Sequence, residues 1–273
     1  MKFLLRSFLF YFIIINNCNI LMGEDKSFVI VTASYNNKEW YQKNLNSVLS
    51  QTYSQWRMIY VNDNSFDGTG ELVADYIVKN NLQNKITLIN NPYRRGHLYN
   101  QFHAIRGCNP EEIIVILDGD DWLANPDVLS YLNTVYQSPN VWLTYGQFWY
   151  FNKNKIGMCK VTPAAVVKNN SFRDYPGWIF SHLRSFYARL FHLIKSKDLI
   201  YKGSFFPMAA DAAVMYPMLE MAGQRAKFIP EVLYIYNDVN PISFHHDRAE
   251  QQKLIKHEIC HNRPRYTALS TLF

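Results

Sequence analysis

Cysteine is scarce in this sequence, and the few cysteines lie far apart. Cys18, Cys108, Cys159 and Cys260 are the four cysteines, and none belongs to a CxxC pair, which argues against a structural zinc site. Cys18 falls in an apolar leader, so three of the four remain in the rest of the chain, and an odd number argues against a complete disulfide framework. We expect neither zinc nor a set of disulfides to hold this fold together.

Signatures of nucleic-acid binding are also missing, although the chain is basic. The net charge is +6 and the pI is about 9.0, yet the Lys and Arg residues are scattered. There is no zinc-finger spacing, no RNA-recognition signature and no basic helix. A mildly basic surface suits a phosphate-bearing small molecule or a membrane equally well. We therefore expect no nucleic acid among the partners.

Charged residues are few, at 18% of the chain against 48% hydrophobic residues. This balance is typical of a globular protein and argues against disorder. The 273 residues fit one large domain, and there are no internal repeats or low-complexity tracts. Aromatic residues are abundant, at 16%, and such rings either line a carbohydrate pocket or fill the core.

The first 24 residues differ from the rest of the chain. Lys2 and Arg6 precede an uninterrupted apolar run from Phe8 to Ile15, which is too short to span a bilayer comfortably. This pattern predicts a signal peptide or an uncleaved signal anchor over residues 1–24, with a buried N-terminal helix as the alternative. We expect a membrane-associated or exported protein, unless the leader tethers a catalytic part that faces the cytoplasm.

From residue 27 onward, apolar β-branched runs alternate with segments of helical periodicity. The expected strands cover residues 27–34, 56–65, 85–91 and 112–121, and the expected helices cover residues 39–52, 70–81 and 97–108. This succession predicts an α/β fold with a mostly parallel sheet flanked by helices. Ligands of such sheets bind beyond the carboxyl ends of the strands. Those ends carry the clusters Ser34-Tyr35-Asn36, Asn62-Asp63-Asn64, Asn90-Asn91 and Asp118-Gly119-Asp120-Asp121, which we expect to converge.

The second half of the chain is less regular. The pattern predicts a helix over 126–136, a strand over 140–151, a loop over 152–178, a helix-rich stretch after it, a helix over 211–223 and a pair of strands over 226–237. The last two strands are expected to be broken at Pro230, because proline cannot donate to a strand ladder.

The acidic end of the fourth expected strand requires a counter-charge. Asp118, Asp120 and Asp121 follow the apolar run from Ile113 to Leu117, and packed carboxylates repel one another unless a cation lies among them. Mg²⁺ and Mn²⁺ prefer oxygen ligands, and often take one or two carboxylates while substrate phosphates complete the shell. The turn therefore predicts a site for Mn²⁺ or Mg²⁺.

At these motifs the chain resembles the family 2 glycosyltransferases of the GT-A fold. The resemblance runs from Ser27 to about His246 and rests on "VTASYNN", "VNDNSFDGT", "NPYRRGHLYNQFHAIRG" and "VILDGDDWL". It implies a GT-A domain over 25–246, followed by a C-terminal tail over 247–273. Residues 25–125 would bind the nucleotide sugar, and residues 126–246 would form a helix-rich acceptor half.

The resemblance also implies roles for residues on the nucleotide side. Thr32, Ser34 and Tyr35 would lie beside the base and ribose of the nucleotide. Asp63 would accept a hydrogen bond from the edge of uracil or a similar base. Arg95 would steer the diphosphate, unless it is an ordinary surface arginine.

For the acidic turn, the resemblance implies that Asp120 ligates the metal. Asp118 would contact the ribose or the water shell of the metal. Asp121 would either share the metal or brace the turn. In a late loop, His245 or His246 would add a histidine to the metal, unless both are unpaired surface residues.

The catalytic base implied by the resemblance is Asp211, at the start of a helix in "FPMAADAAVMYPMLEMAG". A helix N-terminus favours the ionised carboxylate, although a plain N-cap aspartate is the alternative. Members of the family usually carry a second acid just before the base, and this chain has Ala210 there. Trp178 and His182 would line the acceptor pocket or pack in the core.

Together these features predict an inverting, metal-dependent glycosyltransferase. It would move one sugar from a UDP- or GDP-sugar to a hydroxyl of a carbohydrate, lipid or protein acceptor. A single addition is expected because no QxxRW-like element follows Asp211 and no run of membrane-spanning helices is present. A sugar-phosphate nucleotidyltransferase is disfavoured, because no Gly-rich phosphate loop follows the first strand. A non-catalytic module that binds nucleotide sugars is the alternative, to which Ala210 gives weight.

Overall fold

The computed structural model describes residues 24–241 and 249–273. The strands are β1 (Phe28–Ser34), β2 (Trp56–Asn62), β3 (Ile86–Asn90), β4 (Ile113–Ile116), β5 (Trp122–Leu123), β6 (Leu143–Tyr150), β7 (Lys155–Ile156), β8 (Arg184–Tyr187), β9 (Ile200–Tyr201), β10 (Ser204–Phe205) and β11 (Ala226–Tyr236). The helices are α1 (Tyr41–Leu49), α2 (Thr69–Lys79), α3 (His97–Arg106), α4 (Val128–Tyr136), α5 (Ala164–Lys168), α6 (Ala188–His192), α7 (Ala210–Ala222) and α8 (Ala249–His257). The predicted leader and both candidate loop histidines, His245 and His246, lie outside the described residues.

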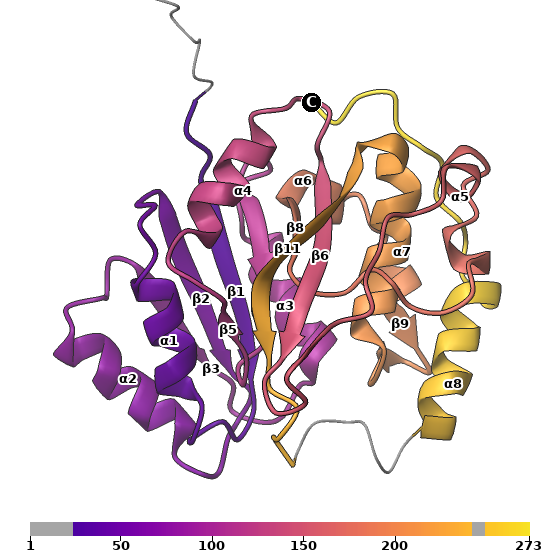
Figure 1. The fold of residues 1–273 in the computed structure, drawn as a ribbon. Coiled ribbons are helices and arrows are strands. Elements are labelled where there is room, and N and C mark those ends of the chain that lie inside the picture. The colour runs from indigo at the N-terminus through magenta and orange to yellow at the C-terminus, as the bar shows by residue number, and fades with distance from the viewer. Residues whose placement is uncertain (1–23, 242–248) are drawn as a thin grey trace, which may run out of the picture.

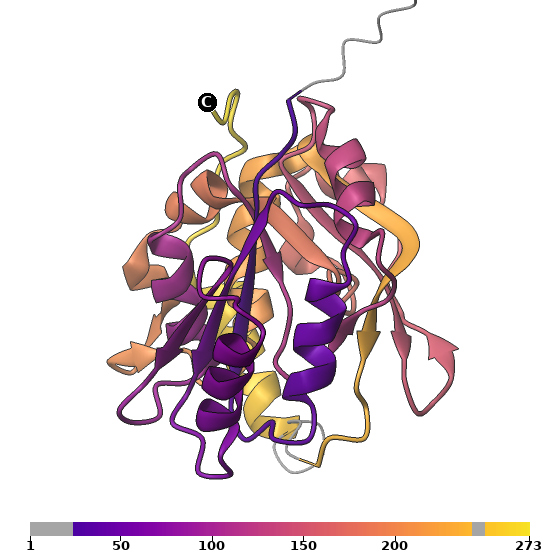
Figure 2. The ribbon, with the colours of Figure 1, turned by 90° about the vertical axis from the view of Figure 1, so that its left-hand side faces the viewer.

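One nine-stranded sheet runs through the molecule (Figure 1), in the order β3-β2-β1-β4-β8-β6-β11-β5, with β7 paired to β6. The first four strands are parallel, as the sequence predicts: Phe28 of β1 pairs with Trp56 of β2 on one side and with Ile113 of β4 on the other. Every residue of β1 and β4 is buried, which explains their continuous apolar runs. The N-terminal half occupies one side of the fold and faces the viewer in Figure 2.

Beyond β4 the sheet becomes mixed. Strand β8 is antiparallel to both β4 and β6, whereas β11 is parallel to β6 and antiparallel to β5. The sequence analysis places only helices and loops around residues 179–210, so β8 corrects that expectation. The predicted break at Pro230 is also wrong: β11 is one strand of 11 residues, and its register to β6 shifts between Ile229 and Val232. Such an irregularity accommodates a proline that lacks an N–H.

Helices cover both faces of the sheet, because side chains along each buried strand alternate between two cores. Val29 and Val31 of β1 belong to the core formed with α3, α6 and α7, while Phe28 and Ile30 belong to the core formed with α1, α2 and α4. This three-layer arrangement is the α/β architecture that the sequence predicts.

The C-terminal segment packs against α7. Ile259 and Leu272 are buried in the core on that face. Arg173, which precedes β8 in the chain, donates hydrogen bonds to Glu220 of α7, from Nε to Oε1 (2.6 Å) and from Nη2 to Oε2 (2.8 Å). The same guanidinium donates to the carbonyl oxygens of Ile259, Arg263 and Pro264. Arg173, paired with Glu220, therefore fastens the C-terminal segment to α7, the helix that contains Asp211.

Within the described part of the chain, no helix is both long enough and apolar enough to cross a membrane.

Candidate active site

The four polar strand ends meet at one edge of the sheet, as predicted. The main-chain N–H of Asp63 donates to the carbonyl oxygen of Ser34 (2.8 Å), which joins the ends of β2 and β1. The side chain of Asn62 donates to Asn90 at the end of β3 (2.9 Å). The side chain of Asn44, in α1, donates to the carbonyl oxygen of Asp118 (2.9 Å), just after β4. This edge, at the lower end of β1 in Figure 1, is where the fold positions a ligand.

The three residues predicted beside the nucleotide have different surroundings. Thr32 is fully buried, and its hydroxyl has no hydrogen-bond partner among the described residues. The hydroxyl of Ser34 accepts hydrogen bonds from Tyr60 (2.8 Å) and Asn37 (3.0 Å), so it braces the turn after β1. Tyr35 is only half-buried, and the guanidinium of Arg94 lies 3.8 Å from its ring centroid. Of the three, Tyr35 presents an aromatic surface at the edge, and its predicted contact with the nucleotide stays a prediction.

Asp63 organises the loop that leads into α3. Its Oδ1 accepts hydrogen bonds from the main-chain N–H of Arg95 (2.8 Å) and from Asn91 (2.8 Å), and its Oδ2 accepts one from the N–H of Gly96 (2.8 Å). Gly96 has a φ of 91°, which favours glycine. Burial raises the pKa of Asp63, but the hydrogen bonds from Arg95 and Asn91 contribute to a larger opposite effect, and the pKa is lowered. Asp63 is therefore ionised, and its predicted role toward the base stays a prediction.

Arg95 extends from this loop into an exposed position. Its guanidinium lies 3.8 Å from the ring centroid of Tyr93 and 4.9 Å from that of Tyr99. No ion pair of the described residues involves Arg95. A cation held by rings keeps its N–H groups accessible, which is compatible with the predicted contact to a diphosphate.

Asp118 lies between a histidine and an arginine. Its Oδ1 is 3.5 Å from Nε2 of His97, the first residue of α3, and its Oδ2 is 3.6 Å from Nη2 of Arg184, the first residue of β8. Burial raises the pKa of Asp118, but His97, Arg184 and His182 lower it by more, so the net shift is downward. The counter-charge that the acidic turn requires thus comes in part from the protein itself.

Asp121 braces the turn, which is one of the two roles predicted for it. Its Oδ1 accepts a hydrogen bond from the main-chain N–H of Asn237 (2.6 Å), and its Oδ2 accepts one from the hydroxyl of Tyr234 (2.5 Å). The same hydroxyl accepts a hydrogen bond from the main-chain N–H of Asp118 (3.2 Å). Burial raises the pKa of Asp121 well above its ordinary value, and the carboxylates of Asp120 and Asp118 add to the effect. Strand β11 therefore holds the acidic turn in place.

Asp120 is the residue expected to ligate the metal, and that role stays a prediction. Its Oδ2 accepts a hydrogen bond from the side chain of Asn240 (2.7 Å). Burial raises the pKa of Asp120 to about 6; the bond from Asn240 opposes this shift and the charge of Asp118 adds to it.

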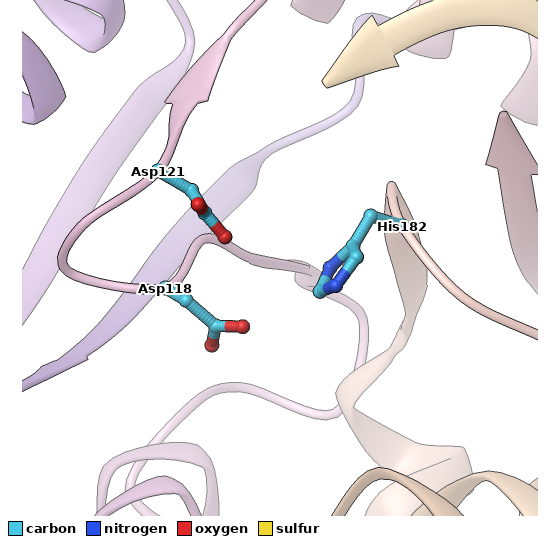
Figure 3. Close-up of side chains that lie close together, drawn as sticks. All are labelled: Asp118, Asp121 and His182. Carbon is cyan, nitrogen blue, oxygen red and sulfur yellow. The ribbon is translucent and has the colours of Figure 1, made fainter. Parts of the chain in front are cut away.

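Three side chains do have the arrangement of a metal site. Asp118, Asp121 and His182 each offer one ligand atom, and these atoms lie within 4.8 Å of one another. Figure 3 shows the two carboxylates, from the turn after β4, and the imidazole, from the segment before β8, facing a common space. Oδ1 of Asp118 is buried and has no hydrogen bond. Two carboxylates with one imidazole fit a divalent cation of the Mn²⁺ type.

His182 and Arg184 are the residues whose place the sequence analysis missed. The ring of His182 stacks on Tyr234 (centroid distance 4.3 Å, interplanar angle 11°), beside the acidic turn, and its predicted contact with the acceptor stays a prediction. The available signal is their chemistry: two polar side chains, His182 before β8 and Arg184 at its first residue, interrupt a segment rich in apolar residues. Trp178, the other candidate for the acceptor pocket, packs edge-on against Phe180 and Tyr216.

Asp211 is the second residue of α7, and it is not the N-cap, because Ala209 holds that position. Its Oδ1 accepts a hydrogen bond from the N–H of Ala212 (2.9 Å), and its Oδ2 lies 4.0 Å from Nη1 of Arg184. The side chain is 35% exposed. The guanidinium of Arg184 therefore lies between Asp211, the predicted base, and Asp118 of the acidic turn.

The fold and this site define a class of proteins. The model of Glycosyl transferase family 2 matches residues 29–208, and the chain belongs to this family. The family predicted from the four sequence motifs is thereby confirmed.

Two curated relatives make the similarity more specific. Over 146 residues the chain is 27% identical to the UDP-Glc:alpha-D-GlcNAc-diphosphoundecaprenol beta-1,3-glucosyltransferase WfgD of Escherichia coli, covering 53% of this chain and 54% of that protein. Over 47 residues it is 38% identical to the putative teichuronic acid biosynthesis glycosyltransferase TuaG of Bacillus subtilis, covering 17% and 19%. The chain thus spans about half the length of the first relative and less of the second.

Solved structures share the fold. TarS of S. aureus in complex with UDP superposes with a TM-score of 0.60 at 15% identity, over 86% of this chain and 64% of TarS. The mannosyltransferase PcManGT of Pyrobaculum calidifontis, in complex with GDP-Man and Mn²⁺, gives a TM-score of 0.56 at 20% identity, over 82% and 60%. These likenesses confirm the predicted GT-A fold.

Proposed function

We propose that the protein transfers one sugar from a nucleotide-diphosphate donor to an acceptor hydroxyl, with inversion at the anomeric carbon. The observation that carries this proposal is the position of Asp211, which faces the acidic turn across the guanidinium of Arg184. A carboxylate on each side of a central cation suits a displacement that has a leaving diphosphate at one end and a hydroxyl to deprotonate at the other.

In the proposed reaction, the oxygen of the acceptor hydroxyl attacks the anomeric carbon from the side opposite the diphosphate. The new C–O bond forms while the bond between the anomeric carbon and the phosphate oxygen breaks, and that electron pair leaves with the nucleoside diphosphate. Asp211, the second residue of α7, takes the hydroxyl proton.

A divalent cation fits the donor side of this reaction. Asp118, Asp121 and His182 would hold it, with Asp120 the further candidate of the turn. Mn²⁺ or Mg²⁺ bound there would neutralise charge on the leaving diphosphate. Arg184 adds a fixed positive charge beside Asp118 whether or not the ion is bound.

Relatives supply candidates for both substrates. TarS was solved with UDP-GlcNAc and PcManGT with GDP-Man, which supports a UDP- or GDP-sugar as the donor. The acceptor of WfgD is a sugar diphosphate linked to undecaprenol, so a lipid-linked glycan is the first acceptor to try here, ahead of a free glycan or a protein. Such an acceptor agrees with the membrane-associated or exported location proposed from the leader.

A non-catalytic module that binds nucleotide sugars is the second candidate. Two observations favour it: Ala210 replaces the second acid, and both carboxylate oxygens of Asp121 accept hydrogen bonds from protein groups. Both functions predict binding of the nucleotide sugar, so only turnover separates them.

The deciding experiment measures nucleotide release from UDP-Glc, UDP-GlcNAc and GDP-Man with Mn²⁺, with and without lipid-linked and soluble glycan acceptors. A transferase releases UDP or GDP, and Asp211→Asn lowers turnover by a factor on the order of 10² to 10⁴ because no base receives the proton. Nucleotide affinity of this variant, measured by titration calorimetry, stays near that of the parent. Saturable binding of a sugar nucleotide, with no release in any mixture, would establish the binding module instead.

A further inference from the structure

Arg184 occupies the centre of the site, at a place that two strands define. It pairs with Ile116 in the antiparallel ladder between β8 and β4, two residues before Asp118. Only 5% of the residue is exposed. A buried guanidinium is costly unless its charge is compensated, so its surroundings show what it serves.

The compensation comes from carboxylates on two different elements. Nη2 of Arg184 lies 3.6 Å from Oδ2 of Asp118, and Nη1 lies 4.0 Å from Oδ2 of Asp211. Among the ion pairs of residues 24–241 and 249–273, this is the only one that reaches Asp211. Because the guanidinium is planar and rigid, it relates the two carboxylates in both distance and direction.

Arg184 acts on the one oxygen of Asp211 that the helix leaves unfixed. Oδ1 of Asp211 already accepts a hydrogen bond from the N–H of Ala212, whereas Oδ2 faces Arg184. Ala210 has no side chain that could orient the carboxylate from the other side. Contacts between catalytic groups are often long before substrate binds and shorten in the complex, and Nε of Arg184, buried without a partner, leaves the guanidinium room to adjust.

We propose that Arg184 is a positioning residue, which holds the carboxylate of Asp211 at a fixed place relative to Asp118 and so aims the base at the acceptor hydroxyl. The proposal rests on the transferase function. A base aimed in this way affects the chemical step, because it takes the proton only as the hydroxyl attacks. A change in nucleotide binding would report instead on the contact between Arg184 and Asp118.

The test is a double-mutant cycle in the full chain with Mn²⁺ and the sugar nucleotide that the parent turns over. Arg184→Met is expected to lower kcat by about 10²-fold, and to change the donor KM and the affinity for UDP or GDP by a much smaller factor. Arg184→Lys retains the charge but not the planar fork, and is expected to recover part of kcat. The double variant Arg184→Met/Asp211→Asn is expected to be no more than about threefold slower than Asp211→Asn alone, because one residue acts through the other.

Losses that multiply in the double variant would overturn the proposal, as would a nucleotide affinity that falls as far as kcat. If Arg184→Met does not fold, the same cycle is run with Arg184→Lys, whose charge preserves the buried compensation. A parent protein that neither transfers sugar nor releases nucleotide would overturn the proposed function and this inference together. If the parent is active but the two substitutions act independently of each other, only the role proposed for Arg184 is overturned.

Discussion

Arg173 and Arg184 are both buried, each with 5% of its surface exposed, and both face carboxylates, yet their hydrogen bonding differs completely. All three nitrogens of Arg173 donate to oxygen atoms at 2.6 to 3.2 Å. Arg184 lies 3.6 and 4.0 Å from its two carboxylates, its Nη2 makes one hydrogen bond of 3.3 Å with Nδ1 of His182, and its Nε has no partner. The protein thus provides a hydrogen-bond acceptor for every nitrogen of Arg173, but not for every nitrogen of Arg184.

The difference teaches how this chain divides stability from function. A buried ion pair that satisfies every N–H contributes to a unique structure, and removing one partner leaves an uncompensated charge. Polar groups left unsatisfied in a core cost free energy, and folds tolerate them mainly where a ligand completes the site. Arg173 therefore marks a structural junction, and Arg184 marks the site itself.

The strongest test of this comparison removes each arginine in turn. Arg173→Met is expected to lower the free energy of unfolding by about 3–5 kcal/mol, because Glu220 stays buried without its partner. Arg184→Met is expected to lower it by about 1 kcal/mol or less, since its charge contacts are long and Asp118 keeps His97. Urea unfolding followed by far-UV circular dichroism measures both values. Equal losses for the two variants would remove the distinction.

A second test asks whether a metal completes the unsatisfied region. Mn²⁺ at about 100 times its dissociation constant should raise the free energy of unfolding by about 2.7 kcal/mol, through binding to the folded state alone. Asp118→Asn is expected to abolish this gain, and His182→Gln to reduce it. Glu220→Gln is the control, because Glu220 pairs with Arg173 and is not part of the site. This variant should be less stable than the parent, yet Mn²⁺ should raise its free energy of unfolding by the same amount. Thermal melting with and without Mn²⁺ gives the comparison, and a gain that survives in Asp118→Asn would rule out the assigned ligand.

The smallest expected effect concerns Asp63, a buried carboxylate that is satisfied but borders the site. Its pKa is lowered in the folded protein, so the folded state binds this proton more weakly than the unfolded state does. Its contribution to stability is therefore present above the ordinary aspartate pKa, and is lost as the pH falls through the folded value. We expect Asp63→Asn to be less stable than the parent by about 1 kcal/mol at pH 7 and by less below about pH 4.

Chemical unfolding at a series of pH values measures this difference. A gap between parent and variant that widens on acidification would contradict the assigned shift. A difference in the free energy of unfolding that stays constant with pH would mean that Asp63→Asn changes packing and not the ionisation of this site.

The sequence predicts the parallel half of the fold well because its signals are local. Strands β1 and β4 are short apolar runs followed directly by polar residues, so the convergence of Ser34, Asp63 and Asp118 follows from topology alone. Strand β8 has no such signal: it forms because its edges pair with β4 and β6, which lie far away in the chain. Missing β8 meant missing Arg184 and the position of His182.

The surroundings of Asp121 were unpredictable for the same reason. Whether Asp121 binds a metal or braces the turn depends on which groups face it. Those groups are Tyr234 and Asn237, which follow it by more than 110 residues in the chain. Motif spacing identified the acids of the turn but not the groups that compensate them. Such long-range partners are set by tertiary packing, which periodicity does not reveal.

The position of β11 has a practical consequence for anyone who shortens this protein. The family match stops at residue 208, before Asp211, Tyr234 and Asn237. A protein trimmed to that boundary would keep the recognisable motifs, yet it would lose Asp211, the proposed base, and both groups that hold Asp121. It would also expose the long edge of β6 that β11 now covers, which invites aggregation.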